Sequence, residues 1–264
     1  MNNICRTKKH MKWFPFCTYD LKDDNTRPVV ICFHHAGGSA AYYRNWTLKK
    51  ENLNFVSVEL PGKGTRLEEE FLNNFEELKV SLCGAINEVV NGRQYVVYGH
   101  SMGAAMAFYV ADYMAREYEK EPEVLIVAGR QAPDTKAEKE FKSYMDDEAL
   151  IYELERYQAT PTEILEDREL LNFFLPSIRR DYELNDSLQY HGEVLNVPVI
   201  AHAGTEDEGA DGKIMGGWKR MTTSEFELQE FDGGHFFIAL EKGEYFETLV
   251  RQIENKVLRG VYEI

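Results

Sequence analysis

The segment from residue 95 to residue 114 changes character halfway, and it constrains the fold more than any other part of the chain. Residues 95–98 are Tyr-Val-Val-Tyr, which favours a strand, and an alanine-rich helical pattern begins at Gly103. Between them lies Gly99-His100-Ser101-Met102-Gly103. A strand, a tight turn with glycines on both sides of a serine, and then a helix predict that the turn presents the Ser101 hydroxyl as a nucleophile.

Short strand-like runs alternate with helical patterns along the rest of the chain. The strand-like runs are residues 29–34, 55–60, 95–99, 123–129, 198–204 and 226–231. The clearest helical patterns cover residues 75–90, 103–118 and 245–258. This alternation predicts an α/β protein with a mostly parallel sheet and helices on both faces. With 264 residues and 44% hydrophobic content, we expect a single domain over residues 1–264.

Residues 134–190 interrupt the alternation, because they contain helical patterns and no strand pattern. Ligands of open α/β sheets bind beyond the carboxyl ends of the strands, so we expect this helical insertion to act as a lid there. Helices that only extend the core are the alternative. Apolar side chains are frequent in the insertion, and we expect several to line a substrate chamber. The candidates are Phe141, Met145, Phe173 and Phe174.

Charge and cysteine content argue against several classes of function. The net charge of −15 disfavours nucleic acid or an anionic membrane as the main partner, because binding to phosphates depends on lysine and arginine. The chain has no apolar run long enough to span a bilayer, and its N-terminus lacks the apolar stretch of a signal peptide. The four cysteines have no C-x-x-C spacing, which predicts free thiols. We therefore expect a cytoplasmic protein without a membrane partner.

A serine hydroxyl is a weak nucleophile at neutral pH and needs a base that a carboxylate orients. Where the serine lies in a strand–turn–helix, the acid and then the histidine follow it along the chain. Three histidines follow Ser101: His191, His202 and His235. His202 lies within a predicted strand and His191 has no turn pattern beside it, whereas His235 lies in the glycine-rich loop 232–237. We predict His235 as the base.

The acid is expected in the loop that follows the strand at 198–204. This loop contains four carboxylates, which are Glu206, Asp207, Glu208 and Asp211. Asp207 lies three residues past Gly204, close enough to the strand end to be held firmly. We predict Asp207 as the acid, and Asp211 is the alternative.

The negative oxygen of a tetrahedral intermediate needs two backbone donors. One is expected to be the N–H of Met102, the residue after the nucleophile. The other is expected from the glycine-rich loop after the first strand, where Ala36 is the preferred donor and Gly37 the alternative. The adjacent His34 and His35 do not predict a metal site, because neighbouring side chains on a strand point to opposite faces.

An ordered set of motifs resembles the type II thioesterases, free-standing α/β-hydrolases that accompany nonribosomal peptide and polyketide synthases. The resemblance extends from about residue 28 to residue 256. The matching segments are residues 33–40, 60–66 and 99–104, Thr160-Pro161 with 169–171, Leu175-Pro176 with 179–181, 204–207, and 233–236.

This resemblance implies the α/β-hydrolase fold and a function. Members of the family hydrolyse acyl thioesters from the phosphopantetheine arm of carrier proteins, which clears stalled or misloaded units. The resemblance assigns Ser101, Asp207 and His235 to a catalytic triad, and the N–H groups of Ala36 and Met102 to the oxyanion hole. We expect an acyl- or peptidyl-carrier domain as the partner. We also expect a monomer without a cofactor of its own, since the phosphopantetheine belongs to the partner.

Two positions depart from the family pattern. Gln158-Ala159 replaces a glycine pair that often precedes the Thr-Pro of the lid, and Lys63 replaces the arginine of the usual Leu-Pro-Gly-Arg. Two other functions use the same motifs. One is a carboxylesterase or a fatty-acyl chain-terminating thioesterase, and the other is an inactive hydrolase fold that serves as a binding module.

Overall fold

A computed structural model describes residues 11–17, 27–49, 52–135, 142–157, 167–239 and 244–257. Its strands are β1 (Val29–Phe33), β2 (Asn54–Ser57), β3 (Tyr95–His100), β4 (Val124–Ala128), β5 (Val199–Gly204) and β6 (Phe226–Phe231). The α-helices are α2 (Arg44–Thr47), α3 (Phe75–Val90), α4 (Met102–Tyr118), α5 (Asp147–Arg156), α7 (Arg168–Asp186), α8 (Gly212–Met215) and α9 (Glu244–Val257). Short 3-10 helices are η1 (Ala40–Tyr43), η2 (Gly64–Arg66), η3 (Gly216–Met221) and η4 (Phe237–Ala239).

The six strands form one sheet in the order β2-β1-β3-β4-β5-β6, and every neighbouring pair is parallel. Each corresponds to a strand-like run in the sequence. The chain moves from β1 outward to β2 and then returns to β3 on the other side of β1. Ligand sites of open α/β sheets lie at such a reversal, beyond the carboxyl ends of the strands. The carboxyl ends of β1 and β3 are Phe33 and His100, so the loop at 34–39 and Ser101 emerge together.

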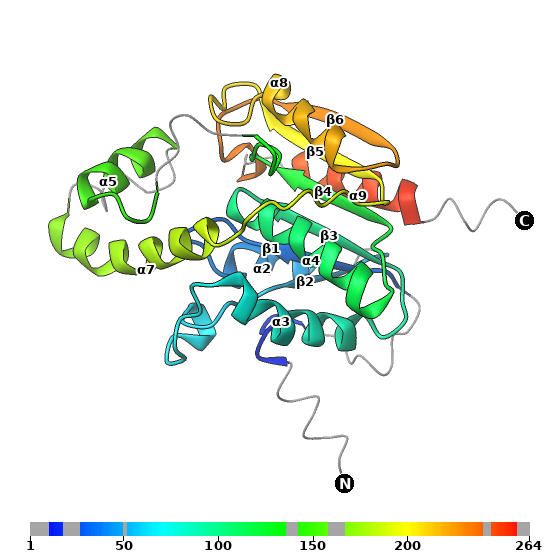
Figure 1. Ribbon diagram of the computed structural model, residues 1–264, viewed down its shortest axis with the longest axis horizontal. Helices are drawn as coiled ribbons and strands as arrows, with labels where there is room; N and C mark the ends of the chain where they lie inside the picture. The colour runs from blue at the N-terminus through cyan, green and yellow to red at the C-terminus, as the bar shows by residue number, and fades with distance from the viewer. Residues whose placement is uncertain are drawn as a thin grey trace, which may run out of the picture.

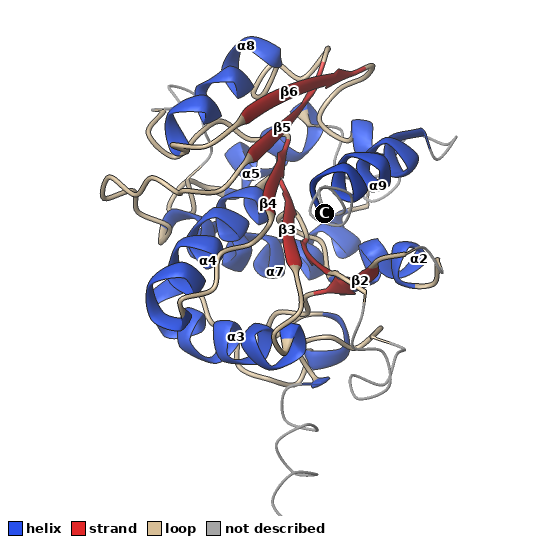
Figure 2. Ribbon diagram, turned by 90° about the vertical axis from the view of Figure 1, so that its right-hand side faces the viewer, coloured by secondary structure: helices blue, strands red, loops and turns tan. Residues whose placement is uncertain are grey.

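Alternation along the strands supplies a core on each face of the sheet. Val29, Ile31 and Phe33 pack in the larger core with residues of α3 and α4, whereas Val30 and Cys32 pack in the smaller core with residues of α9. Figure 2 shows the sheet nearly edge-on, with α3 and α4 on one side and α2 and α9 on the other. The expected fold class, a parallel sheet covered by helices on both faces, is confirmed.

The insertion places α5 and α7 to one side of the sheet (Figure 1). Helix α5 begins at Asp147, because the Asp146 carboxylate caps it by accepting from Ala149 N at 2.9 Å, and residues 142–146 are not helical. Five buried side chains form a separate small core in the insertion: Leu150, Leu154, Leu171, Leu175 and Ile178. Leu184, near the end of α7, is instead buried in the larger core of the sheet.

Several predicted features lie outside the described residues. They are Phe141, Gln158-Ala159 and Thr160-Pro161. Within the described ranges, no helix combines the length and the hydropathy needed to cross a membrane.

Candidate active site

Ser101 lies in a sharp turn between β3 and α4. Its backbone has φ +56° and ψ −120°, a conformation that serine rarely adopts, and its N–H donates to Ala128 O at 2.9 Å. A Cβ atom on Gly99 would lie 2.0 Å from Gly103 O, and one on Gly103 would lie 2.2 Å from Phe33 O. Both glycines are therefore required by close backbone approach, and the turn holds a strained serine at the start of a helix.

His235 and Asp207 meet beyond the carboxyl ends of β5 and β6. Nδ1 of His235 lies 2.8 Å from Oδ2 of Asp207, and both side chains are buried. A carboxylate can only accept, so Nδ1 carries the proton and Nε2 is left as the basic nitrogen. The other Asp207 oxygen accepts from Gly209 N at 3.1 Å, which fixes the orientation of the carboxylate.

The alternative residues have other partners. Asp211 caps α8, because its Oδ1 accepts from Ile214 N at 2.8 Å. His202 is buried within β5, with Nδ1 2.9 Å from Tyr245 Oη and Nε2 2.9 Å from Gln252 Oε1. His191 is exposed. The structure thus pairs Asp207 with His235. Asp211, His202 and His191 take no part in this pair.

His100, the variable residue between Gly99 and Ser101, was not singled out from the sequence. Its Nε2–H donates to the main-chain oxygen of His235 at 2.8 Å, so it holds the loop that carries the imidazole. Complete burial, followed by the fields of His235 and His35, lowers the pKa of His100 well below its ordinary value. His100 is therefore a neutral donor at physiological pH, and its place inside the serine motif is the sequence signal by which it could have been found.

Tyr157, at the end of α5, covers the imidazole of His235. The two ring centroids are 4.2 Å apart with planes inclined by 36°. The guanidinium of Arg156 lies 4.4 Å from the centre of the Tyr157 ring and donates to its hydroxyl at 2.6 Å. These residues line a cleft of about 440 Å³ with Asp207 and Phe236. Among the described residues, no hydrogen bond joins the Ser101 hydroxyl to His235.

The loop after β1 contains Ala36 and Gly37, the two candidates for the second oxyanion donor. Gly37 has φ +82°, and its N–H donates to Asp181 Oδ2 of α7 at 2.6 Å. Within the described part of the chain, the Ala36 N–H has no acceptor. The N–H of Met102 belongs to the first turn of α4, where amides have no partner in the helix. This geometry favours Ala36 over Gly37, because the Gly37 amide is already engaged.

Lys63 and Asp181 form an ion pair that is buried on both sides. Their side chains are 5% and 0% exposed. Burial raises the pKa of Asp181, whereas the Lys63 ammonium and the Gly37 amide favour its charged form. The sequence marked Lys63 only as a departure from the family pattern and Asp181 only as part of a motif, because nothing local reveals that they meet.

The proposed chamber residues of α7 do not face inward. Phe173 is 73% exposed and Phe174 is 39% exposed, and the two rings contact each other. The inward face of α7 is instead occupied by Leu171, Leu175 and Ile178. Met145 packs partly buried against the same small cluster. Phe173 and Phe174 thus lie outside the small cluster, and their role in a substrate chamber stays a prediction.

The residues described contain no group of three or more histidine, cysteine, aspartate or glutamate side chains arranged to hold a metal ion. His34 and His35 are neutral, since burial together with neighbouring positive groups lowers the pKa of each to about 3. The Nδ1–H of His34 donates to His35 O at 2.8 Å. These two histidines contribute to the packing of the loop.

A parallel sheet with a serine at the β3–α4 turn and an aspartate–histidine pair beyond later strands defines the α/β-hydrolase class. The family model for the thioesterase domain matches residues 28–257. The chain belongs to this thioesterase-domain family.

Individual relatives narrow the comparison. The chain is 30% identical over 226 residues to the gramicidin S biosynthesis protein GrsT of Aneurinibacillus migulanus, covering 85% of this chain and 88% of that protein. It is 32% identical over 216 residues to the thioesterase PikA5 of Streptomyces venezuelae, covering 81% of this chain and 76% of that protein.

A solved structure gives the same result in three dimensions. The type II thioesterase BorB from the borrelidin biosynthetic cluster superposes with a TM-score of 0.73 at 30% identity, over 88% of this chain and 93% of that one. The resemblance to type II thioesterases that the motifs indicated is confirmed.

Proposed function

We propose that this protein hydrolyses acyl thioesters on the phosphopantetheine arm of carrier proteins, and thereby clears stalled or misprimed nonribosomal peptide or polyketide synthases. The observation that carries the proposal is the 2.8 Å contact between His235 Nδ1 and Asp207 Oδ2 in a chain that also holds Ser101 in a strained strand–helix turn. The relatives described above, which include a gramicidin S biosynthesis protein and a type II thioesterase of a borrelidin cluster, support this choice of substrate.

In the first half-reaction, Ser101 Oγ attacks the thioester carbonyl while His235 Nε2 takes its proton. Asp207 stabilises the resulting imidazolium, and the N–H groups of Met102 and Ala36 bind the negative oxygen. The carbon–sulfur bond then breaks. A thiol has a pKa of about 8.5, so the pantetheine sulfur leaves readily as a thiolate and takes the proton from the imidazolium.

In the second half-reaction, His235 removes a proton from water, and the hydroxide formed attacks the acyl-enzyme. The ester bond to Ser101 breaks, the carboxylic acid product is released, and the proton returns from His235 to Ser101 Oγ. All these groups come from one chain, so the proposal requires neither a cofactor nor a second copy. Thiolate departure needs little acid assistance, and we therefore expect deacylation to be the slower half.

The experiment compares one acyl group presented in three forms: on a carrier protein, on a short pantetheine thioester, and as an oxygen ester. We expect the carrier-bound thioester to have the highest kcat/KM, and Ser101→Ala to abolish hydrolysis of all three. Losing a triad member costs several orders of magnitude, so activity above about a tenth of wild type in Ser101→Ala would contradict the assignment. Equal or faster hydrolysis of the oxygen ester would favour a carboxylesterase. Preference for a free long-chain acyl thioester would favour chain termination.

A further inference from the structure

The Asp181 carboxylate joins three segments that are distant in the sequence. Oδ2 accepts from Gly37 N at 2.6 Å in the loop after β1, and it also accepts from Lys63 Nζ in the loop after β2. Asp181 itself belongs to α7, 118 residues beyond Lys63. One fully buried oxygen therefore connects the helical insertion to the loop that holds the Ala36 N–H.

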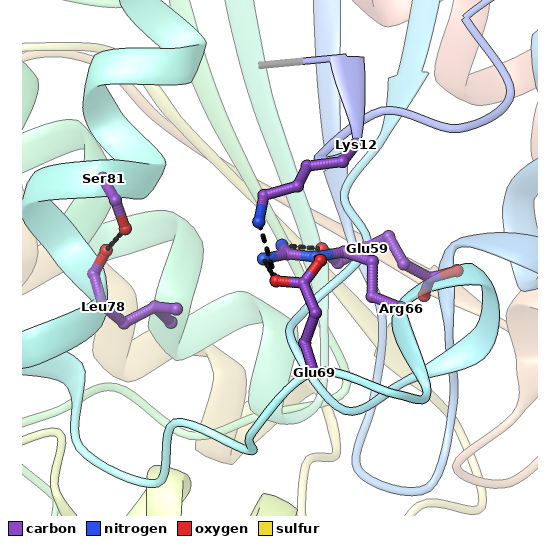
Figure 3. A network of polar contacts seen from close by, with 6 residues as sticks. All are labelled: Lys12, Glu59, Arg66, Glu69, Leu78 and Ser81. Atoms are coloured by element: carbon purple, nitrogen blue, oxygen red, sulfur yellow. Dashed lines mark hydrogen bonds and ion pairs between the residues drawn. The ribbon is translucent and has the colours of Figure 1, made fainter. Parts of the chain in front are cut away.

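The Lys63 side of this contact is held rigidly. Arg66 Nη1 donates to Glu59 O at 2.9 Å, and its other nitrogens bind both carboxylate oxygens of Glu69 at 3.0 and 2.7 Å. Figure 3 shows this network, in which Lys12 also reaches Glu69, and a separate contact within α3 from Ser81 to Leu78. The loop that carries Lys63 is therefore fixed by its own hydrogen bonds, independently of α7.

The loop after β1 is held at two points. The Glu59 carboxylate accepts from Ala40 N at 3.0 Å and from Thr65 N at 3.0 Å, which joins the end of this loop to the Lys63 loop. At its centre, residues 35–38 form a turn that Gly38 N closes by donating to His35 O at 3.0 Å, and Gly37 has the φ of +82° that the third position of a type II turn requires. Gly37 N donates to Asp181 Oδ2 and thereby ties this turn to α7. The position of the turn, and with it the direction of the Ala36 N–H, is therefore coupled to Asp181.

The charge of Lys63 also reaches this loop. After burial, the field of Lys63 is the next largest cause that lowers the pKa of His34. A buried ammonium close to the loop favours negative charge there, as forms on the substrate oxygen in the tetrahedral intermediate. Asp181 compensates the ammonium while the enzyme is at rest.

We propose that Asp181 and Lys63 are positioning residues that set the oxyanion-binding amide of Ala36 through Gly37. This inference rests on the proposed function of Ser101 as the nucleophile. It means that the insertion contributes to chemistry through the fixed end of α7, in addition to any covering role. A merely structural ion pair would lower stability without a specific effect on acyl transfer.

The test measures kcat and KM with a p-nitrophenyl ester, inhibition by a trifluoromethyl ketone that forms a tetrahedral adduct with serine, and the melting temperature. We expect Asp181→Asn and Lys63→Met to lower kcat by about 10- to 100-fold, since a small misplacement of a catalytic group has effects of this size. KM should change less than about twofold, because binding of the substrate in its ground state does not depend on the oxyanion hole. Affinity for the trifluoromethyl ketone should fall in parallel with kcat.

Two further variants separate positioning from stability. Lys63→Arg keeps the charge and should retain kcat within about threefold. Leu184→Ala removes a fully buried side chain one turn along α7 without touching the ion pair, so it should lower the melting temperature and leave kcat unchanged. If Asp181→Asn does not fold, the contrast between Lys63→Met and Lys63→Arg carries the test.

The inference is overturned if kcat of Asp181→Asn, or of Lys63→Met, stays within twofold of wild type while Ser101→Ala is inactive. It is also overturned if Leu184→Ala, with a melting temperature equal to that of Asp181→Asn or Lys63→Met, lowers kcat by as much as that variant does. Hydrolysis by Ser101→Ala would instead overturn the proposed function. Because the p-nitrophenyl ester has no carrier protein, neither result depends on which acyl carrier the enzyme prefers.

Discussion

The sheet and the helical insertion bury their apolar side chains in different ways. The described residues of the sheet and its covering helices form two large cores, one on each face, with residues of β1, β3, β4 and β5 entirely inaccessible. In the described part of the insertion, the buried apolar side chains form a small cluster between α5 and α7. Large aromatic side chains remain exposed on it, among them Tyr144 and Phe173 at 82% and 73%. From this difference in burial we expect the sheet to be the rigid part of the molecule and the described helices of the insertion to have lower local stability than the strands.

The division between these regions runs through α7 rather than at its ends. Leu175 and Ile178 belong to the small cluster, whereas Leu184 is buried in the sheet core and Asp181 holds the loop after β1. Ser187, just past the helix, accepts from Phe75 N at 2.9 Å. The second half of α7 is therefore attached to the sheet, whereas its first half packs against α5. If the insertion acts as a lid, we expect α5 and the first half of α7 to take part in its movement and the second half of α7 to stay in place.

The largest expected effect lies in the sheet region. Asp207→Asn should reduce kcat by about 10⁴-fold, because the amide no longer fixes the tautomer of His235 that leaves Nε2 basic. Steady-state hydrolysis of a thioester checks this, and a normal circular dichroism spectrum shows that the fold is kept.

Asp211→Asn is the matched control, because Asp211 only caps α8 and asparagine caps equally well. It should keep kcat within about twofold. A larger loss for Asp211→Asn than for Asp207→Asn would show that the acid was assigned wrongly.

The second prediction compares one leucine from each region. Leu82 is fully buried in the core between α3 and the sheet, and Leu154 is 5% exposed in the insertion. Leu82→Ala should lower the free energy of unfolding by about 2–5 kcal/mol. Leu154→Ala should change global unfolding less, because the small cluster opens locally before the sheet does. Urea unfolding measures the first effect, and amide hydrogen exchange in α5 measures the second.

Hydrogen exchange of the wild type sharpens this comparison. Amides of α5 should exchange faster than those of the strands, and more slowly once Ser101 carries a non-hydrolysable acyl group. The end of α7 near Leu184 should exchange like the sheet. Uniformly slow exchange that ignores acylation would show that the whole insertion is a permanently packed cover.

Sequence reasoning succeeded where the information is local or ordered along the chain. Strand-like runs, the glycines around Ser101 and the serine–acid–histidine order depend on neighbouring residues and on chain direction, and the fold they predicted is confirmed. The triad and oxyanion roles remain predictions, although the geometry is consistent with them. The contacts of Asp181 with Lys63 and of Tyr157 with His235 join distant segments, and no periodicity reveals such partners. The same limit applies to the exposure of Phe173 and Phe174. Composition shows that the insertion is rich in apolar residues, but it does not show which of them are buried.

The third prediction uses three histidines of the sheet region that are buried or partly buried, and the sequence has no histidine between residues 134 and 190. Burial lowers the pKa of His34 and His35 to about 3 and that of His202 to about 4, all below the ordinary value of 6.5. Between these values the unfolded chain binds more protons than the folded one, so stability rises with pH.

Stability should therefore fall as the pH drops from 6.5 toward 4, with a slope of at most about 1.4 kcal/mol per pH unit for each histidine. Urea unfolding at several pH values measures this slope, and His202→Gln should reduce it. A constant unfolding free energy between pH 6.5 and 5 would contradict the burial of these imidazoles as neutral groups.

The smallest expected effect concerns Tyr157, where the insertion touches the imidazole of His235. The rings of Tyr157 and His235 lie 4.2 Å apart, and an aromatic contact of this kind is worth about 0.5–1.5 kcal/mol, which corresponds to at most about a tenfold change in rate. Tyr157→Ala should therefore lower kcat by less than about tenfold, because the imidazole loses a support but keeps Asp207. Tyr157→Phe keeps the ring and serves as the control, with kcat near wild type in the same thioester assay. An increase in kcat/KM for Tyr157→Ala would show instead that Tyr157 obstructs the approach of substrate to Ser101.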